Sequence, residues 1–405
     1  MITRELPLHD TEFAALLQSL RRNHFKWDIY ADGKPTVGRD AIILESEEHQ
    51  FLVATAQALW SEINVLERVV ESNHDQRGVL GVPDTLQKLI RRSTDAATTG
   101  PRSVRIDFHY TVDKEWVAVE CNSDLPGGVV EMAGMGAELS HEHRNVVERF
   151  GDVFIPGDLA AAFQRAFAPF SAVGLVYDTT FSIDLQQIEY IRRWLEQSGH
   201  TVVIGGPETL AFDESSKGIA VGMKGTPLQA LYRFYPAELI GALQNAAVWQ
   251  AVAGELPCCN PLSAGISQSK RLLALHDPET SPAIHEHMPR SVLPEHLADG
   301  QLAEERERWV VKTAYGRMGD GIAFGVDYSP DQWQQIVAQV YHTPTEFVVQ
   351  ERFDSAAMWF SGSVGYPVVG VHVVDGEFAG YFSRYDSDQI IRDGAKYVPT
   401  MVRFS

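Results

Sequence analysis

The fold is decided by the stretch Val104-Arg105-Ile106-Asp107-Phe108-His109-Tyr110 and, after a short connector, Trp116-Val117-Ala118-Val119-Glu120-Cys121-Asn122-Ser123-Asp124. Apolar and polar side chains alternate through the first half, which is the period-2 pattern of a half-buried strand. The second half alternates in the same way, with Val117, Val119 and Cys121 predicted on one face and Glu120 and Asn122 on the other. We therefore expect a β-hairpin with one apolar and one polar face.

A turn centred on residues 113–114 would set the register of this hairpin. Antiparallel pairing then places Asp107 opposite Glu120 and Arg105 opposite Asn122. Like charges directly opposite one another destabilise a sheet, so two facing carboxylates indicate a cation between them. Carboxylate and amide oxygens suit Mg²⁺ better than a softer metal. The pattern leaves two interpretations open, a magnesium site or a solvated strand face with ordinary surface charges.

The composition is that of a globular protein. The 405 residues are enough for more than one hydrophobic core, and they are 44% hydrophobic and 22% charged. The formal charge of -20, from 34 Lys and Arg against 54 Asp and Glu, argues against nucleic acid or an anionic membrane as a partner. A local group of basic side chains can still bind a phosphate ligand in such a chain.

The cysteines and the termini indicate the compartment. Cys121, Cys258 and Cys259 do not form the even, spaced pattern of a disulfide-stapled domain. Residues 1–22 mix acids and bases and lack the apolar run of a signal peptide. The chain also lacks a stretch of about 20 apolar residues that could span a membrane. We expect a cytoplasmic protein with reduced thiols.

The first two thirds of the chain are predicted to change from helical to mixed structure. Apolar residues at helical spacing predict that residues 1–98 are largely helical, with a loop over residues 28–40. Residues 129–150 are also predicted to be helical. A strand at residues 172–177, a helix ending at Gly199 and a strand at residues 201–204 predict a parallel βαβ unit. Residues 218–235 are predicted to be a pair of strands about residues 224–225.

The last third is predicted to be rich in strands. A helix over residues 267–276 would carry Lys270, and a helix is also expected around residues 333–341. The predicted strands are residues 309–313, 322–326, 346–352, 368–374, 378–384 and 397–404. Asp375-Gly376 between apolar runs is a strong hairpin signal.

A glycine-rich loop follows Lys312 and reads Tyr315-Gly316-Arg317-Met318-Gly319-Asp320-Gly321. Gly316, Gly319 and Gly321 free the backbone N–H groups to approach a ligand. The loop matches neither the P-loop motif nor G-x-G-x-x-G between a strand and a helix, so neither a P-loop NTPase nor a dinucleotide fold is indicated. Two interpretations remain, a loop over nucleotide phosphates with Lys312 supplying charge, or a plain flexible hairpin.

Other candidate residues are weak evidence of function when each is taken by itself. A lone Lys270 on a helix is usually solvated, and Gln350 on a strand is usually a satisfied polar group. The pairs His141-x-His143 and His285-x-His287 would point to different sides of a helix, so we expect surface residues. The chain has no G-x-S-x-G, so serine hydrolase chemistry is not indicated.

Several short motifs occur in a consistent order, namely Arg105-x-Asp107, Glu120-x-Asn122-x-Asp124, Asn260-Pro261 with Lys270, Val310-Val311-Lys312, Val349-Gln350-Glu351, residues 380–384 and Tyr397-Val398-Pro399. This set resembles the synthetase domain of glutathionylspermidine synthase and its relatives. The resemblance covers residues 100–405 and, more faintly, Phe25-Lys26-Trp27-Asp28. After Asp124 the chain departs from the family pattern, because Leu125-Pro126-Gly127-Gly128 stands where Thr or Ser is common.

The resemblance implies an α+β, ATP-grasp-like fold in permuted order, with a small α/β (pre-ATP-grasp) domain and a helical N-terminal region. On this basis residues 1–100 would form a mainly helical region, and residues 101–169 the acidic metal-binding hairpin of the ATP-grasp core. Residues 170–257 would form a small α/β domain on the substrate side. Residues 258–405 would form the nucleotide-binding lobes.

The resemblance also implies an ATP-dependent carboxylate–amine ligase that uses ATP and Mg²⁺. An acid would be phosphorylated by ATP, and an amine would displace phosphate to give an amide. Both substrates would be small or peptide-like, without nucleic acid or a membrane as a partner. Such phosphoryl transfer needs positioning and charge neutralisation more than a protein nucleophile. Two alternatives stay open, a relative that binds ATP without ligation and a kinase that stops at the phosphorylated substrate.

The same resemblance implies roles for individual residues. Asp107, Glu120 and Asn122 would hold Mg²⁺. Arg105 would neutralise the transferred phosphate or the acyl phosphate, and Arg384 would close over the reacting centre. The nucleotide would be bound by Lys270, Lys312, Gly316, Gly319, Gly321 and, on the adenine side, Gln350.

Overall fold

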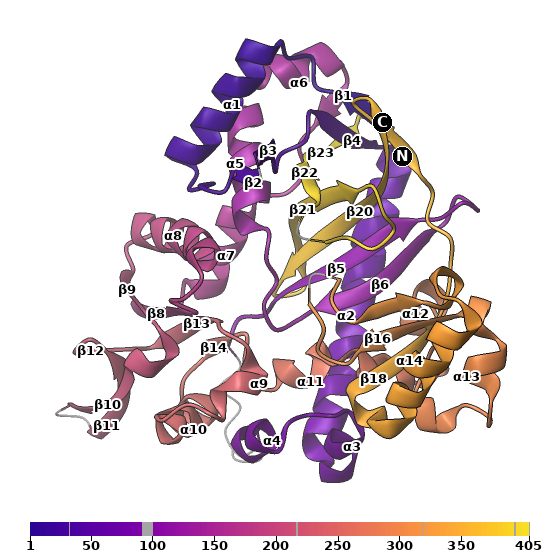
Figure 1. Ribbon diagram of the computed structural model, residues 1–405. Coiled ribbons are helices and arrows are strands. Elements are labelled where there is room, and N and C mark those ends of the chain that lie inside the picture. The colour runs from indigo at the N-terminus through magenta and orange to yellow at the C-terminus, as the bar shows by residue number, and fades with distance from the viewer. Residues whose placement is uncertain (32, 91–99, 216–217, 318, 393, 405) are drawn as a thin grey trace.

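The computed structural model describes residues 1–405 except for residues 32, 91–99, 216–217, 318, 393 and 405. Its centre is a six-stranded sheet in the order β22-β21-β20-β5-β6, with β19 paired to β20 (Figure 1). The strands are β5 (Ser103–Tyr110), β6 (Trp116–Asn122), β19 (Met358–Phe360), β20 (Ser363–Val374), β21 (Glu377–Asp386) and β22 (Lys396–Val398). The predicted hairpin therefore lies in the middle of the molecule.

The hairpin has the predicted register at its polar end. Asp107 pairs with Glu120 and Arg105 with Asn122, and the register shifts after Asp107 so that Phe108 pairs with Ala118. This β-bulge leaves Val119 as the extra residue. The prediction that Val119 shares the apolar face of Cys121 is wrong. Val119 lines a cavity beside Glu120, because the bulge changes the alternation of faces along β6.

The neighbouring strand explains why the polar end of β5 fits inside a sheet. Gly370 of β20 pairs with Asp107. A Cβ atom at Gly370 would lie 2.7 Å from Cδ of Arg105 and 2.8 Å from Oδ1 of Asp107. A glycine here therefore leaves the space in which the arginine and the carboxylate meet.

The predicted βαβ unit is confirmed. β8 (Ala172–Tyr177) and β9 (Thr201–Gly205) pair in parallel, with α8 (Ser182–Gln197) between them, in a sheet of order β14-β13-β8-β9. The interpretation of residues 218–235 as one strand pair is only partly right. β11 (Gly218–Met223) pairs with β12 (Thr226–Pro227) and β10 (Leu210–Ser215), whereas β13 (Ala230–Phe234) joins β8 and β14 (Cys258–Cys259).

A third sheet carries Lys312 and Gln350. Its order is β15-β18-β16-β17, with β15 (Ser291–Val292), β16 (Trp309–Thr313), β17 (Ile322–Phe324) and β18 (Phe347–Glu351). Its core includes Trp309 and Trp333, the latter from α14 (Pro330–His342). The predicted helix over residues 267–276 is wrong in detail. α11 (Ala264–Gln268) is followed by a 3₁₀ turn, Lys270–Leu275.

The two ends of the chain meet in a further sheet, of order β1-β4-β23-β7. β23 (Thr400–Arg403) pairs with β4 (Asp40–Leu44) in parallel and with β7 (Val153–Phe154), and β4 pairs with β1 (Ile2–Glu5). The predicted strand over residues 397–404 is therefore divided. Pro399 separates β22, in the central sheet, from β23, and both termini lie close together (Figure 1).

Helices cover these sheets. They include α1 (Asp10–Asn23), α2 (Ser46–Ser72), α3 (His74–Val79), α4 (Asp84–Ile90), α5 (Val129–Ser140), α6 (Arg144–Phe150), α7 (Leu159–Phe167), α9 (Ala237–Ile240), α10 (Ala246–Glu255), α12 (Pro282–His287) and α13 (Gln301–Glu304). The helical prediction for residues 129–150 is confirmed. In the loop predicted over residues 28–40, β2 (Tyr30–Ala31) pairs with β3 (Lys34–Pro35).

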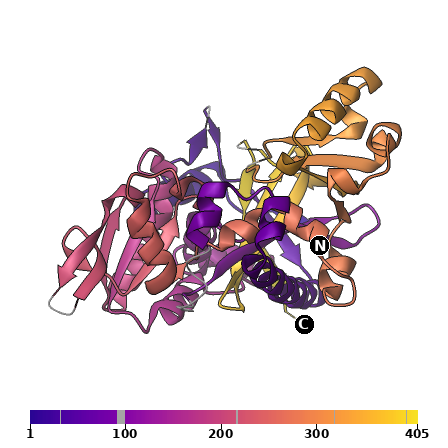
Figure 2. The same ribbon diagram turned by 90° about the horizontal axis from the view of Figure 1, so that it is seen from below.

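The pink segment with β8 and β13 and the orange segment with β16 and β18 stand on opposite sides of the molecule (Figure 2). The yellow strands of the central sheet lie between them. The division into four domains stays a prediction, and its first boundary adjoins residues 91–99, which lie outside the described residues. Among the described residues, no helix is both long and apolar enough to cross a membrane.

The helix α2 is fixed to the central sheet by a buried charge. Both carboxylate oxygens of Glu67 accept from Arg102, at 2.9 Å each, and Ser263 Oγ donates to the same carboxylate at 2.8 Å. The Glu67 side chain is 2% exposed. A buried carboxylate needs such partners because its desolvation is costly.

Replacing Glu67 tests this anchor. We expect Glu67→Ala to lower the free energy of unfolding by about 3–5 kcal/mol, because it leaves the Arg102 guanidinium buried without its partner. The control is Glu148→Ala, which breaks an ion pair with Arg144 whose side chains are 61% and 74% exposed. Exposed pairs contribute about 0–1 kcal/mol. Denaturant titrations that gave equal losses for both variants would contradict the assignment.

Candidate active site

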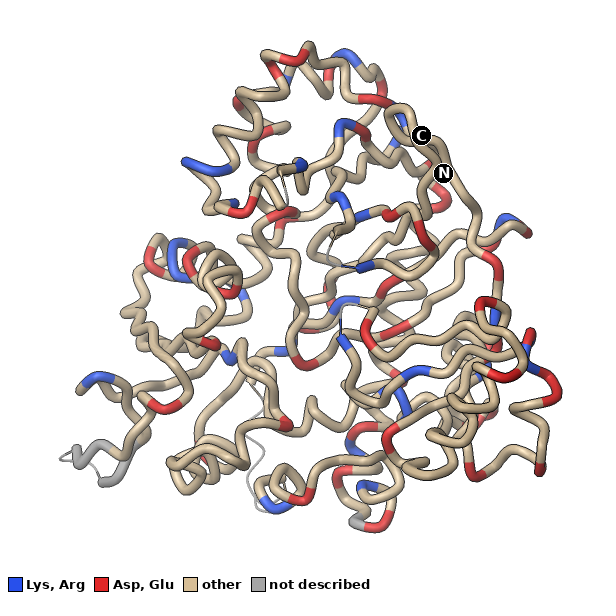
Figure 3. Tube along the Cα trace, in the orientation of Figure 1, with Lys and Arg blue, Asp and Glu red and all other residues tan. Residues whose placement is uncertain are grey.

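A cavity of about 510 Å³ lies where the polar end of the hairpin faces the sheet that carries Lys312. Segments from three sheets and from the loops between them form its walls. Its lining includes Arg105, Asp107, His109, Val119, Glu120, Asn122, Leu125, Gly127, Asp178, Phe181, Asp184, Lys312, Gly316, Arg317, Gly319, Gln350, Phe353 and Arg384. Basic and acidic residues are interspersed along the central strands (Figure 3).

Asp107 is held by two guanidinium groups. Arg105 donates from Nε to Oδ1 at 2.5 Å and from Nη2 to Oδ2 at 2.8 Å, and Arg384 Nη2 donates to Oδ2 at 3.0 Å. Both guanidinium carbons also lie over the ring of Phe382, at 4.9 and 5.1 Å from its centroid. Partial burial lowers the pKa of Arg384, and repulsion from the Arg105 guanidinium lowers it further. Asp107 neutralises part of this charge.

Glu120 lies between Asn122 and a lysine. Asn122 Nδ2 is 3.1 Å from Glu120 Oε1 and 3.4 Å from Asp107 Oδ2, and Lys270 Nζ is 3.7 Å from Glu120 Oε2. Burial alone would raise the pKa of Glu120, but Lys270, Asn122 and Arg105 together lower it to about 2. Glu120 is therefore a carboxylate throughout the neutral range.

Lys312 stands on the facing wall of the cavity. Its Nζ donates to Gln350 Oε1 at 2.6 Å, and Gln350 Nε2 donates to Ser291 Oγ at 3.1 Å. Burial lowers the pKa of Lys312 to about 8, against the opposing effect of Glu120. A nearby anion would favour the charged form of this lysine.

The predicted donor set consists of residue types that a hard cation prefers. Asp107, Glu120 and Asn122 are joined by hydrogen bonds at the polar end of the hairpin, and their oxygens are the ligand type that Mg²⁺ prefers. The described residues contain no group of three or more His, Cys, Asp or Glu suited to a metal. The predicted set therefore has an amide, that of Asn122, in addition to two carboxylates.

A family model extends over nearly the whole chain. Residues 12–403 match the family described as glutathionylspermidine synthase pre-ATP-grasp. The chain belongs to the glutathionylspermidine synthase family. The α+β, ATP-grasp-like fold with a pre-ATP-grasp domain that the sequence resemblance implies is confirmed. No curated protein matches the sequence.

Solved structures share the fold at low sequence identity. A glutathione synthetase-like effector from Globodera pallida, in its apo form, is 11% identical with a TM-score of 0.66, and the match covers 98% of each chain. A putative gamma-glutamylcysteine synthetase from Methylobacillus flagellatus is 14% identical with a TM-score of 0.45, over 85% of this chain and 87% of that chain. The first similarity shows the fold alone.

The cavity brings together most of the residues that the sequence singled out. The exceptions are Lys270 and Gly321, which do not line it. Lys270 donates to the carbonyl of Gly316 at 2.6 Å and so holds the glycine-rich loop. A Cβ at Gly321 would lie 2.4 Å from Thr313 Cγ2, so this glycine is required by packing. Met318 of the same loop lies outside the described residues.

Sequence reasoning missed charged residues on the side of β8. Asp178 and Asp184 line the cavity, and burial together with Asp178 raises the pKa of Asp184 to about 7. Arg317 of the glycine-rich loop also lines it and pairs with Glu238 at 2.8 Å. A usable signal existed for Asp178, which directly follows a parallel strand, where ligands bind in open α/β sheets.

The segment of residues 125–128, where the sequence departs from its family, supports the arginines. The Gly127 carbonyl accepts from Arg105 Nη1 at 2.9 Å. Gly128 has a φ of +97°, and a Cβ there would lie 2.3 Å from the ring of Phe382. The glycine therefore allows the ring to pack under both guanidinium groups.

Alanine at Gly128 tests this packing. We expect Gly128→Ala to lower the free energy of unfolding by about 2–4 kcal/mol, because it adds left-handed backbone strain and overpacks the Phe382 ring. The matched control is Gly127→Ala, where no atom lies within 4 Å of the added Cβ. Thermal and denaturant unfolding would check both. Equal stability of the two variants would contradict the proposed packing.

Proposed function

We propose that this protein is an ATP-dependent carboxylate–amine ligase that forms an amide bond through an acyl phosphate. The proposal is carried by one observation. In a chain of the glutathionylspermidine synthase family, two carboxylates and an amide at the hairpin end face Lys312 across a cavity of about 510 Å³. That volume falls within the range of small-molecule sites.

The nucleotide end of the cavity is proposed to lie against β16 and β18. Val310, Ile322, Phe324 and Phe353 supply an apolar lining that suits a purine base. Gln350 and Lys312 lie beside this lining, and the proposed site has Gln350 on the adenine side and Lys312 at the phosphates. Lys270 donates to the carbonyl of Gly316 and so holds this part of the loop at the cavity wall. Backbone N–H groups of a glycine-rich loop suit phosphate oxygens.

The phosphate end is proposed to lie against the hairpin. Asp107, Glu120 and Asn122 would hold Mg²⁺, which when bound neutralises charge on the phosphates. Arg105, which is buried, and Arg384, which is partly exposed, are cations on the same wall. They would stabilise the negative charge that builds up as the phosphoryl group moves to the acid, because preorganised charges cost no reorganisation during the reaction.

The amine is proposed to enter beside α8. Asp178 and Asp184 line this side, and the raised pKa of Asp184 reflects burial and the repulsion between the carboxylates. An ammonium group between them would relieve that repulsion. Phe181 lies at the same wall with 60% of its surface exposed, so an apolar part of the substrate has a contact there. Arg317 would bind a carboxylate of the other substrate, the acid.

Incubation with panels of acids and amines tests the ligase assignment. We expect one acid–amine pair to give ADP and an amide in equal amounts, identified by product mass. Asp107→Asn should lower this activity at least about 100-fold, because it removes a proposed metal ligand. The control is Asp113→Asn, an exposed carboxylate in the turn of the same hairpin.

Other products would decide against ligation. ATP binding without ADP release over the whole panel would favour a nucleotide-binding relative. A phosphorylated product that accumulates with no amide would favour a kinase. If Asp107→Asn left Mg²⁺-dependent ATP binding unchanged, the metal assignment would be wrong under each of these functions.

The lowered pKa of Lys312 gives a second test of the nucleotide site. At pH 8.5 a lysine with a pKa of about 8 is mostly neutral, and bound phosphates would raise this pKa. Mg-ATP binding should therefore take up part of a proton at pH 8.5, and less at pH 6.5, where the lysine is already charged. Calorimetry in buffers of different ionisation enthalpy measures this uptake.

Two variants separate Lys312 from other titrating groups. Lys312→Met should lose the uptake because it has no titrating group. Lys312→Arg should also lose it while keeping a positive charge, because the guanidinium stays protonated. Undiminished proton uptake in both variants would show that the phosphates do not lie against Lys312.

A further inference from the structure

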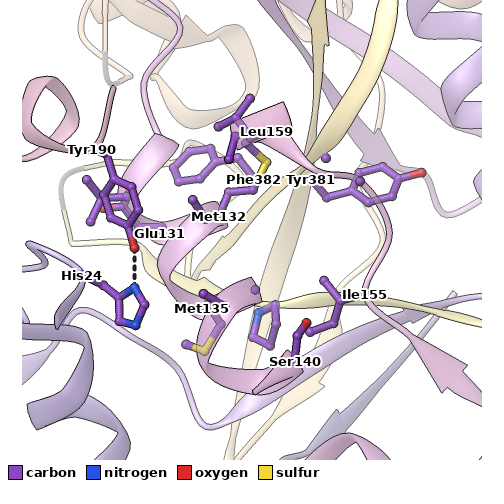
Figure 4. Close-up of a pocket in the computed structure, with 18 of the residues that line it drawn as sticks. His24, Glu131, Met132, Met135, Ser140, Ile155, Leu159, Tyr190, Tyr381 and Phe382 are labelled. Carbon is purple, nitrogen blue, oxygen red and sulfur yellow. Dashed lines mark hydrogen bonds between the residues drawn. The ribbon is translucent and has the colours of Figure 1, made fainter. Parts of the chain in front are cut away.

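A second cavity, of about 630 Å³, is lined in part by Phe382, over whose ring the guanidinium groups of Arg105 and Arg384 lie. Helices α5 and α8, the end of α1, the start of α7 and the strands β21 and β22 form its walls, and Figure 4 shows ten of its lining residues by name. Among the described residues, the linings of the two cavities have no member in common. The proposed ligase chemistry therefore makes no use of this space.

One part of this second cavity is apolar and adaptable. Met132, Leu159 and Phe382 gather at one end in Figure 4, and Met135 and Ile155 lie at the other. Thioether side chains make favourable contacts with aromatic rings and fill irregular gaps. This lining suits a compact aromatic or branched apolar group.

The cations at the wall already have partners. Lys26 is 2% exposed, and its Nζ contacts Asp28 at 2.9 Å and Glu131 at 2.7 Å. Two carboxylates thus surround one ammonium group, which also lies over the ring of Tyr397. Arg193 donates to the carbonyl of Asn23 at 2.9 Å and lies over aromatic rings.

The histidine at the wall is also engaged. His24 contacts the Tyr190 hydroxyl through Nδ1, as the dashed line in Figure 4 marks, and Glu138 through Nε2 at 2.8 Å. Asp158 adds a further carboxylate to the lining. Carboxylates in and directly behind the wall therefore outnumber the Lys and Arg side chains. An excess of negative charge favours a cationic ligand.

We propose that this second cavity binds a small primary amine with an aromatic or branched apolar body. The ammonium group would lie toward Glu131, and the apolar body would lie toward Met132, Leu159 and Phe382. This proposal does not rest on the ligase function, because the residues involved belong to a separate cavity.

The chain offers a matched pair of variants at this wall. Gly136 lies in α5 and lines the cavity, and the atom nearest to an added Cβ is Ile155 Cγ2, at 3.9 Å. Gly136→Ala should therefore be tolerated and leave the space open. Gly136→Phe should fill the space with an aromatic ring. Glu131→Gln removes the carboxylate charge while Lys26 keeps Asp28 as its partner.

Phenethylamine, 2-phenylethanol and 3-phenylpropionate form a probe set that differs in the charge of the head group. Calorimetry or ligand-observed NMR with the full chain would measure their binding. We expect phenethylamine to bind at least about 10-fold more tightly than the alcohol or the acid. Gly136→Ala should keep this binding, Gly136→Phe should abolish it, and Glu131→Gln should remove the preference for the amine.

Asp184→Asn distinguishes this binding from that at the proposed amine end of the first cavity. It should leave phenethylamine binding at the second cavity unchanged. A circular dichroism spectrum and a cooperative thermal unfolding transition like those of the wild type would show that Gly136→Phe is folded. The proposal is overturned if wild-type protein shows no saturable binding at millimolar amine, if the acid binds as tightly as the amine, or if folded Gly136→Phe binds phenethylamine normally. Each of these results leaves the ligase test unaffected.

Discussion

The contact of Asp107 with Arg105 and Arg384 is the interaction on which the centre of the structure depends. A buried carboxylate, a buried guanidinium group and a partly buried one meet between three strands, and burying the carboxylate or the Arg105 guanidinium alone would be costly. The arrangement requires space, which Gly370 supplies on one side, and a flat support, which the Phe382 ring supplies on the other. The strands β5, β20 and β21 are thereby fixed relative to one another at the cavity wall.

This cluster explains the form of the surrounding loops. Gly127 accepts from Arg105 through its carbonyl, and Gly128, in a left-handed conformation and without a Cβ, lies directly against the Phe382 ring. The segment that departs from the family pattern is thus part of the support of the arginines, and Leu125 and Gly127 also line the cavity. The support of the arginines and the lining of the cavity are therefore coupled in this segment, because the same few residues serve both.

The cavity combines groups whose charges suit different parts of a reaction. Glu120 is ionised because Lys270 and Asn122 stabilise its charge, whereas Lys312 is weakly basic because burial disfavours the ammonium form. Burial also acts on Asp184, where it disfavours the charged carboxylate and raises the pKa to about 7. Such environments are typical of sites that bind and move charged groups. This agrees with the membership of this chain in an ATP-grasp ligase family.

The sequence by itself determined the hairpin, the pairing of Asp107 with Glu120, the βαβ unit and the family, because these depend on periodicity and on short ordered motifs. It could not determine the bulge at Val119, since one extra residue changes the faces of a strand without changing its composition. It also could not show that residues on either side of Pro399 enter different sheets, or that Asp178 and Arg317 meet at one cavity. Only tertiary structure decides such contacts, because they join segments far apart in the chain through packing that no local pattern records.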